Sequence, residues 1–295
     1  MKKIGFYIFI LKAWFVSLLP FWILYILSDF LYVIVYHIVR YRRKVTFTNL
    51  INAFPEKTET ERKQIEKRYY HNLCDIVVEF IKIRHITVEQ LKQRMVVTNP
   101  ELLHELFNQK KSVFLAVGHC GNWDWFGKAM PYITKHKVFA IYKELNNSDF
   151  DEYMKSMRSR FGVPALIESK STYRSLLLSK NSANAVFLAG DQTPGGIEAD
   201  YWTTFLNQDT PFFVGIEKMA KSLNYAVLFF DIKRVKRGYY QATITPVSLN
   251  PKETTTNEIT ETYVRLLEKV IISNPDNWLW SHRRWKHKRE GILTA

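Results

Sequence analysis

The N-terminal part of the chain is a long apolar stretch. Residues 4–39 are almost entirely aliphatic and aromatic, and residues 40–44 add a basic cluster. The stretch is interrupted only by Lys12, Asp29 and His37. The uncharged residues 13–27 are fewer than the ~20 that span a bilayer, and no small-residue cleavage site of a signal peptide is present. We predict that residues 1–44 form a hydrophobic membrane-anchor helix, spanning or interfacial, with its basic flank on the cytoplasmic side; a buried helix pair is the alternative.

Beyond residue 55 the hydrophobic pattern alternates between helical and strand-like periods. Apolar residues at three- and four-residue spacing predict a helix over residues 58–84. Short runs rich in β-branched residues predict strands near residues 112–118, 138–142, 164–167, 185–189, 226–232 and 239–246. Further helices are predicted near residues 88–95, 100–109, 123–134, 148–161, 172–180, 212–223 and 257–273. Residues 45–295 therefore read as one α/β domain, with a mostly parallel central sheet flanked by helices and an antiparallel pair of strands at one edge.

The charge of the chain points to an anionic partner. The 295 residues carry 42 Lys and Arg against 28 Asp and Glu, a net charge of +14. A hydrophobic content of 47% excludes a disordered chain, and charges spread over most of the sequence exclude a polytopic membrane protein. Much of the excess lies beside the N-terminal stretch and among the tail tryptophans of residues 277–286. This placement favours a membrane surface or an acidic protein over nucleic acid.

A histidine directly follows the first predicted strand of the domain. The apolar run 112–118 delivers His119 at its C-terminal end, where functional residues of open α/β sheets gather. Asp124 lies in the first turn of the next predicted helix. Across this junction it is placed to accept a hydrogen bond from one ring nitrogen of His119, which leaves the other nitrogen as a general base. A structural histidine is the alternative, and Cys120 is interpreted as turn packing because nothing evident would activate it.

Other strand ends supply further polar candidates. Asp191 and Gln192 follow the strand near residues 185–189, at the sheet edge expected to hold His119, and are placed to orient a substrate or a cation. An ordinary polar loop is the alternative. The basic candidates for contact with a phosphate are Lys143, Arg158 and Arg160. A solvated charged surface is the alternative for these three.

Taken in order, these blocks resemble the lipid A biosynthesis acyltransferase family, the late lauroyl- and myristoyltransferase-like enzymes. The resemblance covers nearly the whole chain. It rests on the apolar N-terminus, on His119 with Asp124, and on the following positions: Arg43, Asn49, Leu50, Phe54, Pro55, Lys143, Arg158, Arg160, Gly162, Asp191, Gln192, Trp278, Trp280, His282, Arg283, Arg284, Trp285 and Lys286. Lys143 departs from the arginine common in relatives and lacks its bidentate geometry.

The resemblance implies a glycerolipid acyltransferase-like fold and a membrane-associated O-acyltransferase. Such an enzyme transfers a fatty acyl chain from acyl-acyl carrier protein, or acyl-CoA, to a hydroxyl of a lipid A precursor or similar glycolipid. His119 and Asp124 would be the catalytic dyad, without a metal or other cofactor. The substrate-binding residues would be Lys143, Arg158, Arg160, Asp191 and Gln192. The implied location is the inner membrane of a Gram-negative bacterium, with the catalytic domain on the cytoplasmic face.

Other functions fit the same residues. A lysophospholipid or an amino-acid lipid is a possible acceptor, and the sequence does not separate these from a glycolipid. A thioesterase-like hydrolase would use the same dyad with water. A non-enzymatic basic protein that binds membranes or nucleic acid is the third class, and it would not need a histidine at a strand end.

Overall fold

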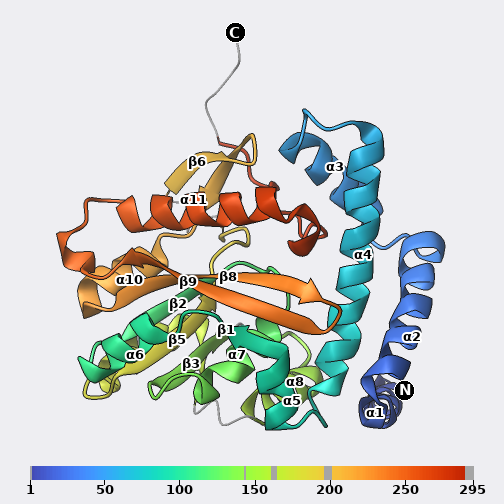
Figure 1. Cartoon of the computed structure of the whole chain (residues 1–295), viewed down its shortest axis with the longest axis horizontal. Coiled ribbons are helices and arrows are strands. Elements are labelled where there is room, and N and C mark those ends of the chain that lie inside the picture. The colour runs from blue at the N-terminus through green and yellow to red at the C-terminus, as the bar shows by residue number, and fades with distance from the viewer. Residues whose placement is uncertain (1, 143, 161–164, 196–200, 290–295) are drawn as a thin grey trace.

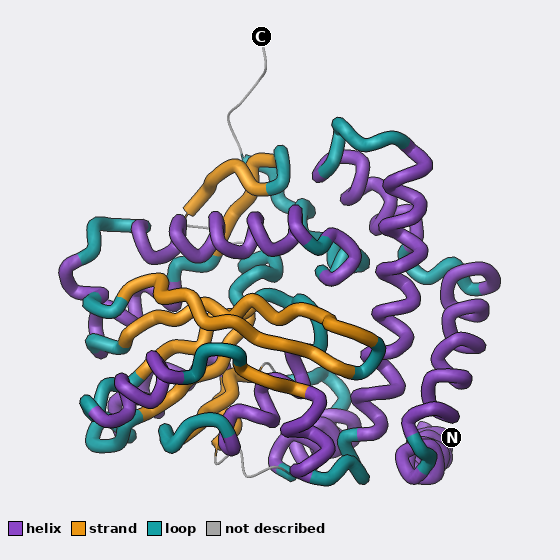
Figure 2. Tube along the Cα trace, viewed as in Figure 1, coloured by secondary structure: helices purple, strands orange, loops and turns teal. Residues whose placement is uncertain are grey.

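A mostly parallel sheet lies between two layers of helices in the computed structural model, which describes residues 2–142, 144–160, 165–195 and 201–289 (Figures 1 and 2). The described part of the chain forms a seven-stranded sheet in the order β1-β9-β8-β2-β5-β3-β4 and a separate β6-β7 hairpin. The main-sheet strands are β1 (Met95–Val97), β2 (Val113–Val117), β3 (Lys137–Tyr142), β4 (Ala165–Glu168), β5 (Asn184–Ala189), β8 (Ala226–Lys236) and β9 (Tyr239–Ser248). The hairpin is formed by β6 (Tyr201–Phe205) and β7 (Gln208–Phe212).

The predicted α/β class and all six predicted strands are confirmed. The order of the strands differs from the prediction in one respect, because the antiparallel pair β8–β9 is not at the edge: β1 pairs in parallel with β9 outside it. The sequence predicts no strand here: Met95, the first residue of β1, is the last residue of the helix predicted near residues 88–95. The three-residue strand is too short to show a period in the sequence.

Helices cover both faces of the sheet. They are α3 (Arg43–Ala53), α4 (Glu59–Lys82), α5 (Val88–Arg94), α6 (Glu101–Asn108), α7 (Trp123–Ala129), α8 (Ser148–Ser159), α9 (Thr172–Leu178), α10 (Gly215–Leu223) and α11 (Glu258–Ser273). Helices α10 and α11 lie over one face, and α5, α6 and α7 lie over the other (Figure 1). Strand β2 is buried along its whole length between these layers, which explains its uninterrupted apolar sequence.

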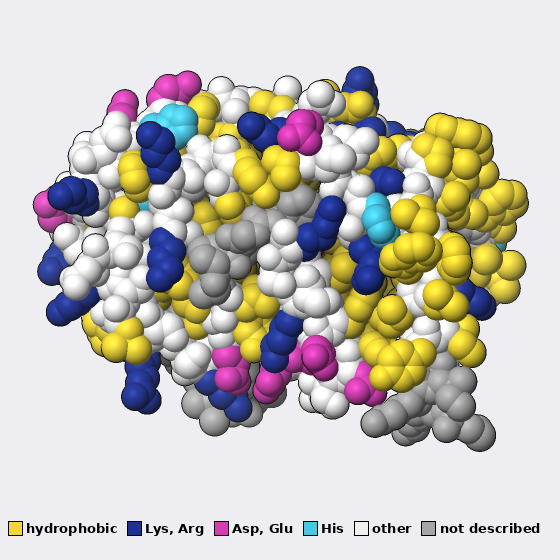
Figure 3. Space-filling view, turned by 90° about the horizontal axis from the view of Figure 1, so that it is seen from below, with side chains coloured by type: hydrophobic (Ala, Val, Ile, Leu, Met, Phe, Trp, Pro, Cys, Tyr) yellow, Lys and Arg dark blue, Asp and Glu magenta, His cyan; other side chains and the backbone are white. Residues whose placement is uncertain are grey.

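The N-terminal helices pack side by side with α4. They are α1 (Lys2–Leu18), α2 (Phe21–Tyr32) and the π-helix η1 (Val33–Ile38), which continues α2. Within the described chain, Phe21–Ile38 is the helical segment long and apolar enough to cross a membrane, and 22% of it is buried. Much of its surface, and that of α1, therefore remains exposed and apolar. Figure 3 shows hydrophobic side chains gathered over this side of the molecule.

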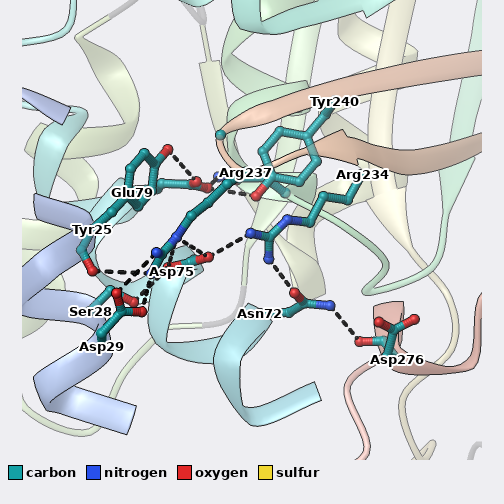
Figure 4. Close-up of polar contacts among 12 residues, drawn as sticks. Tyr25, Ser28, Asp29, Asn72, Asp75, Glu79, Arg234, Arg237, Tyr240 and Asp276 are labelled. Atoms are coloured by element: carbon teal, nitrogen blue, oxygen red, sulfur yellow. Dashed lines mark hydrogen bonds and ion pairs between the residues drawn. The ribbon is translucent and has the colours of Figure 1, made fainter. Parts of the chain in front are cut away.

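Ionic and polar contacts join α2 to α4 and to the β8–β9 turn (Figure 4). The carboxylate of Asp75 on α4 accepts hydrogen bonds from the Ser28 hydroxyl (2.6 Å) and from the guanidinium groups of Arg234 (2.6 Å) and Arg237 (2.7 Å). Arg237 also forms an ion pair with Asp29 at 2.6 Å. One face of α2 is therefore fixed to the α/β body, although the domain boundary predicted at residue 44 stays a prediction.

Candidate functional site

The turn after β2 carries His119 to the edge of the sheet. Gly121 makes this turn possible with a φ of +53°, and a Cβ there would lie 3.1 Å from the carbonyl oxygen of Ile232. Asn122 then caps α7, since its side-chain oxygen accepts a hydrogen bond from the backbone N–H of Trp125 at 2.9 Å. Strand, turn and cap together fix the backbone on both sides of the histidine.

Asp191 is the carboxylate that holds the His119 ring. Strands β2 and β5 pair in parallel, with Val117 opposite Ala189, so the residues after both strands meet at one edge. Asp191 Oδ1 lies 2.6 Å from His119 Nδ1, and Oδ2 accepts hydrogen bonds from the His119 backbone N–H (2.8 Å) and from Trp278 Nε1 (2.7 Å). Burial raises the pKa of Asp191, but the charge of His119 and these hydrogen bonds outweigh it and lower the pKa to about 2. Asp191 is therefore ionised at neutral pH.

Asp124 does not occupy the position expected from the sequence. Its carboxylate forms an ion pair with Lys128, one turn later on the same face of α7. Lys128 is almost fully buried, and burial lowers its pKa while Asp124 opposes this effect, so Lys128 needs a nearby counter-charge. Among the described residues no hydrogen bond joins Asp124 to His119, and the expected pairing is corrected to Asp191. A catalytic role for Asp124 stays a prediction.

The His119 ring borders a cavity of about 270 Å³. Asp124, Lys128, Arg158 and Gln192 line the same cavity, together with apolar and aromatic side chains from α7, β3 and β5. With the Nδ1 proton donated to Asp191, the Nε2 atom is an acceptor, and the Gln192 Nε2 atom lies 3.2 Å from it. This tautomer is assigned from the hydrogen bonds. Charged groups of both signs and the Gln192 amide therefore surround an imidazole nitrogen that carries no proton.

A larger cavity of about 1160 Å³ adjoins the first. The two share Ile141, Ala189 and Gln192 in their walls, so they meet beside the His119 ring. Leu188 and Met219 are among the apolar residues that line the larger cavity. Charged side chains, among them Glu144, Glu168 and Lys170, line it as well, so the larger cavity has a mixed polar and apolar lining.

The structure separates the two arginines that were expected to bind one phosphate. Arg158 lines the His119 cavity, whereas the guanidinium of Arg160 donates a hydrogen bond to the carbonyl oxygen of Ile83 at the end of α4. Residues two apart on a helix point in different directions, so a shared bidentate contact is not made. The third predicted basic residue, Lys143, lies outside the described residues.

The C-terminal segment contributes to the site in a way that sequence reasoning missed. Trp278 is buried and donates to Asp191, and its backbone forms a bridge with Cys120. His282 Nε2 accepts a hydrogen bond from the backbone N–H of Thr193 at 3.2 Å, and burial lowers the pKa of His282 to about 4. Trp278, the first tryptophan of the basic tail, is therefore an internal support of the site and not a surface side chain. Burial raises the pKa of the Cys120 thiol, which agrees with a packing role.

The family model and the related proteins that match this chain all concern one enzyme family. The family described as "Bacterial lipid A biosynthesis acyltransferase" matches residues 1–287. A lipid A biosynthesis lauroyltransferase of Escherichia coli is 21% identical over 284 residues, which covers 95% of this chain and 90% of that protein. A lipid A biosynthesis palmitoleoyltransferase of the same species is 22% identical over 252 residues, with 85% and 80% covered. Because the match spans nearly the whole sequence, the chain belongs to the bacterial lipid A biosynthesis acyltransferase family and is an acyltransferase.

Proposed function

We propose that this protein transfers a fatty acyl chain from an acyl thioester to a hydroxyl of a lipid A precursor, with His119 as general base. The observation that carries the proposal is the His119–Asp191 contact at 2.6 Å, which leaves Nε2 beside a cavity lined by Arg158 and Lys128. The names of the relatives support the class of acceptor. Acyl-acyl carrier protein is the proposed donor, with acyl-CoA as the alternative.

The chemistry follows from the position of the ring. The acceptor oxygen forms a bond to the thioester carbonyl carbon while its proton passes to Nε2 of His119. The carbon–sulfur bond then breaks, and the proton moves on to the leaving thiolate. Asp191 stabilises the imidazolium formed between these steps. A general base within hydrogen-bond reach of the acceptor hydroxyl contributes roughly 10²–10⁴-fold to the rate. Thiolate leaves readily, so the proposed reaction uses no metal and no acyl-enzyme.

The surrounding groups suit the two substrates. Arg158 is placed to contact an anionic headgroup. The apolar side chains of the larger cavity are placed to hold the acyl chain, with Gln192 where the two cavities meet. Asp191, which was expected from the sequence to contact the substrate, is proposed to position His119. Arg160 is not proposed to contact the headgroup. The helical layers around a parallel sheet agree with a glycerolipid acyltransferase-like fold.

Membrane association is part of the proposal. The apolar surface of α1 and α2 would lie in the membrane interface, with residues 1–44 as the anchor and residues 45–295 as the catalytic domain. One face of α2 is held by Asp75 and Arg237, which favours an interfacial position over a free spanning helix. The expected location is the cytoplasmic face of the inner membrane.

Turnover measurements test the assignment of the base. The purified protein is given lauroyl-acyl carrier protein and a lipid A precursor, and acylated product is counted for the wild type and for His119→Ala, Asp191→Asn and Asp124→Asn. We expect kcat to fall by about 10²–10⁴-fold for the first two. Glu89→Gln, an exposed carboxylate on α5, is the matched control. Full activity of His119→Ala would overturn the proposal.

The same assay separates the alternatives. Free fatty acid released at the full rate without any acceptor would identify a thioesterase-like hydrolase. Turnover with a lysophospholipid or an amino-acid lipid, but not with the lipid A precursor, would keep the reaction and replace the acceptor. A larger loss for Asp124→Asn than for Asp191→Asn would return the positioning role to Asp124.

A further inference from the structure

A second polar cavity lies apart from the His119 site. It has a volume of about 670 Å³ and is bounded by α3, by the turn between β6 and β7, and by the C-terminal residues that follow Trp280. In Figure 1, α3 and the β6–β7 hairpin lie at the same end of the molecule as the C-terminal segment. None of the residues that line it also lines the His119 cavity or the larger cavity that adjoins it. Ligand binding in this cavity is therefore independent of the proposed reaction.

The lining of this cavity is strongly basic. Its cationic side chains are Lys44, Arg283, Lys286, Lys288 and Arg289, and Asp209 is the single carboxylate. Within the described part of the chain, none of these five cations forms an ion pair. Five cations around one concave space repel one another, so an anion bound there would be stabilised by all of them.

Two polar atoms in the wall are buried and lack a hydrogen-bond partner among the described residues. They are Nε2 of Gln208 and Nε2 of His287. The Gln208 amide is oriented by its oxygen, which accepts a hydrogen bond from Asn52 at 3.2 Å, so its NH₂ group is left to donate elsewhere. A buried donor without an acceptor costs about 1–3 kcal/mol. An oxygen-rich anion in the cavity would supply the missing acceptor.

The walls of the cavity are held in place by the core. Asn49 on α3 donates hydrogen bonds to the carbonyl oxygens of Trp280 (2.9 Å) and His282 (3.1 Å), which ties the C-terminal segment to α3. Trp285 Nε1 donates to the hydroxyl of Thr210 at 2.8 Å, which ties the same segment to β7. The basic side chains therefore extend from a fixed frame.

We propose that this cavity binds the phosphate headgroup of an anionic membrane lipid. Val45 and Trp285 give it an apolar wall beside its cations, which suits a molecule with both a phosphate and a glyceryl or acyl portion. Ile38 and Val39, 71% and 63% exposed, end the apolar N-terminal surface just before Lys44. A concave site of this volume fits a single headgroup, whereas an acidic protein would require a broad exposed patch.

Vesicle binding tests the site with full-length protein. Vesicles of phosphatidylcholine with and without phosphatidic acid are titrated with the wild type and with Lys286→Gln/Lys288→Gln. Each cation near an anionic surface contributes about fivefold, so we expect the double variant to bind the phosphatidic acid vesicles about tenfold or more weakly. Binding to pure phosphatidylcholine should not change. Lys135→Gln/Lys180→Gln removes the same charge at exposed lysines outside the three cavities and is the matched control.

Single-charge variants test the cavity itself. Gln208→Glu places a carboxylate where the unpaired amide lies and should weaken binding about fivefold or more, whereas Asp209→Asn removes the one acid and should strengthen it. Gln93→Glu on α5 controls for the added charge. Equal losses of binding to phosphatidic acid vesicles in the cavity variants and in the control variants would show general charge attraction and overturn the proposal. So would pocket variants that lose binding to acidic acyl carrier protein but not to phosphatidic acid.

Discussion

Asp191 uses both of its carboxylate oxygens to hold the strand end that carries His119. One oxygen faces the ring, and the other binds the backbone N–H of the same residue and the indole of Trp278. The carboxylate is only 2% exposed, so these contacts replace the water that it has lost. Asp191 therefore restricts the rotation of the His119 ring and determines which ring nitrogen carries the proton.

The contact with Asp191 determines the tautomer of the neutral His119 ring. In the wild type we expect the neutral ring to carry its proton on Nδ1. Asp191→Asn removes the charged acceptor, and the preference for Nδ1–H should be lost. The ¹⁵N chemical shifts of the two ring nitrogens, recorded at alkaline pH on protein with labelled histidine, distinguish the two tautomers.

Asp124→Asn is the informative comparison for this measurement. Asp124 binds Lys128 and not the ring, so we expect the His119 shifts of this variant to match the wild type. A tautomer that changes in Asp124→Asn and persists in Asp191→Asn would contradict the geometry.

Part of this site was predictable from local sequence. His119 and Asp191 each follow an apolar run, so the sequence alone places both at the same edge of a parallel sheet. The choice between two carboxylates was not predictable, because the contact of Asp191 with His119 depends on the pairing register of β2 and β5. Trp278 was missed for the same reason: its partner is 87 residues away in the chain.

At the scale of elements, α4 connects the N-terminal helices to the loop that contains His119. Glu79 on α4 is fully buried and accepts hydrogen bonds from Tyr25 on α2 (3.0 Å), Asn122 (2.7 Å) and Tyr240 on β9 (2.8 Å) (Figure 4). Asn122 is the residue that caps α7. One carboxylate thus links α2, the sheet and the helix that follows the histidine.

Glu79 should make the stability of the protein fall as pH rises toward neutrality. Burial raises the pKa of Glu79 to about 7. The hydrogen bonds from Tyr240 and Asn122 lower this pKa, and the charge of Asp75 raises it. Between about pH 4.5 and 7 the folded state then binds the proton more tightly than the unfolded state. The free energy of unfolding should decrease by up to about 1.4 kcal/mol per pH unit across this window.

Denaturant unfolding in an uncharged detergent at several pH values measures the slope of the free energy of unfolding against pH. Glu79→Gln cannot ionise, so its slope should be flatter than that of the wild type, while the exposed Glu89→Gln should keep the wild-type slope. Equal slopes for Glu79→Gln and the wild type would show that Glu79 ionises in the folded state as it does in the unfolded chain.

Besides α3, the elements that the sequence did not predict include one short strand and one hairpin. Strand β1 has three residues, and the β6–β7 hairpin contains Pro211, a poor strand residue. The hairpin is stabilised by tertiary contacts instead, since Trp285 binds Thr210 and the buried Arg284 donates to the carbonyl oxygen of Pro211 at 2.6 Å. Local propensity carries no information about such contacts.

At the scale of the whole molecule, apolar and basic surfaces are distributed unevenly. The exposed apolar residues of α1, α2 and η1 gather on one side, where Figure 3 shows them with few charges among them. The basic cavity lies where the chain leaves this surface and enters α3. An apolar patch of this kind on a folded protein marks an interaction site. An apolar surface beside a basic cavity suits the boundary between the acyl chains and the headgroups of a membrane.

The apolar contribution to membrane binding can be measured without the ionic one. Phe15 and Trp22 are 57% and 66% exposed and make little contact with the core. Phe15→Ser/Trp22→Ser should therefore leave the free energy of unfolding nearly unchanged but weaken binding to neutral phosphatidylcholine vesicles, because each large apolar side chain buried in lipid contributes about 1.5–3 kcal/mol. Leu178→Ser on α9, 82% exposed and far from this surface in sequence, is the control and should bind as the wild type does. Unchanged binding of the double variant would place the membrane contact elsewhere, and a loss that high salt reverses would assign it to charge instead of apolar burial.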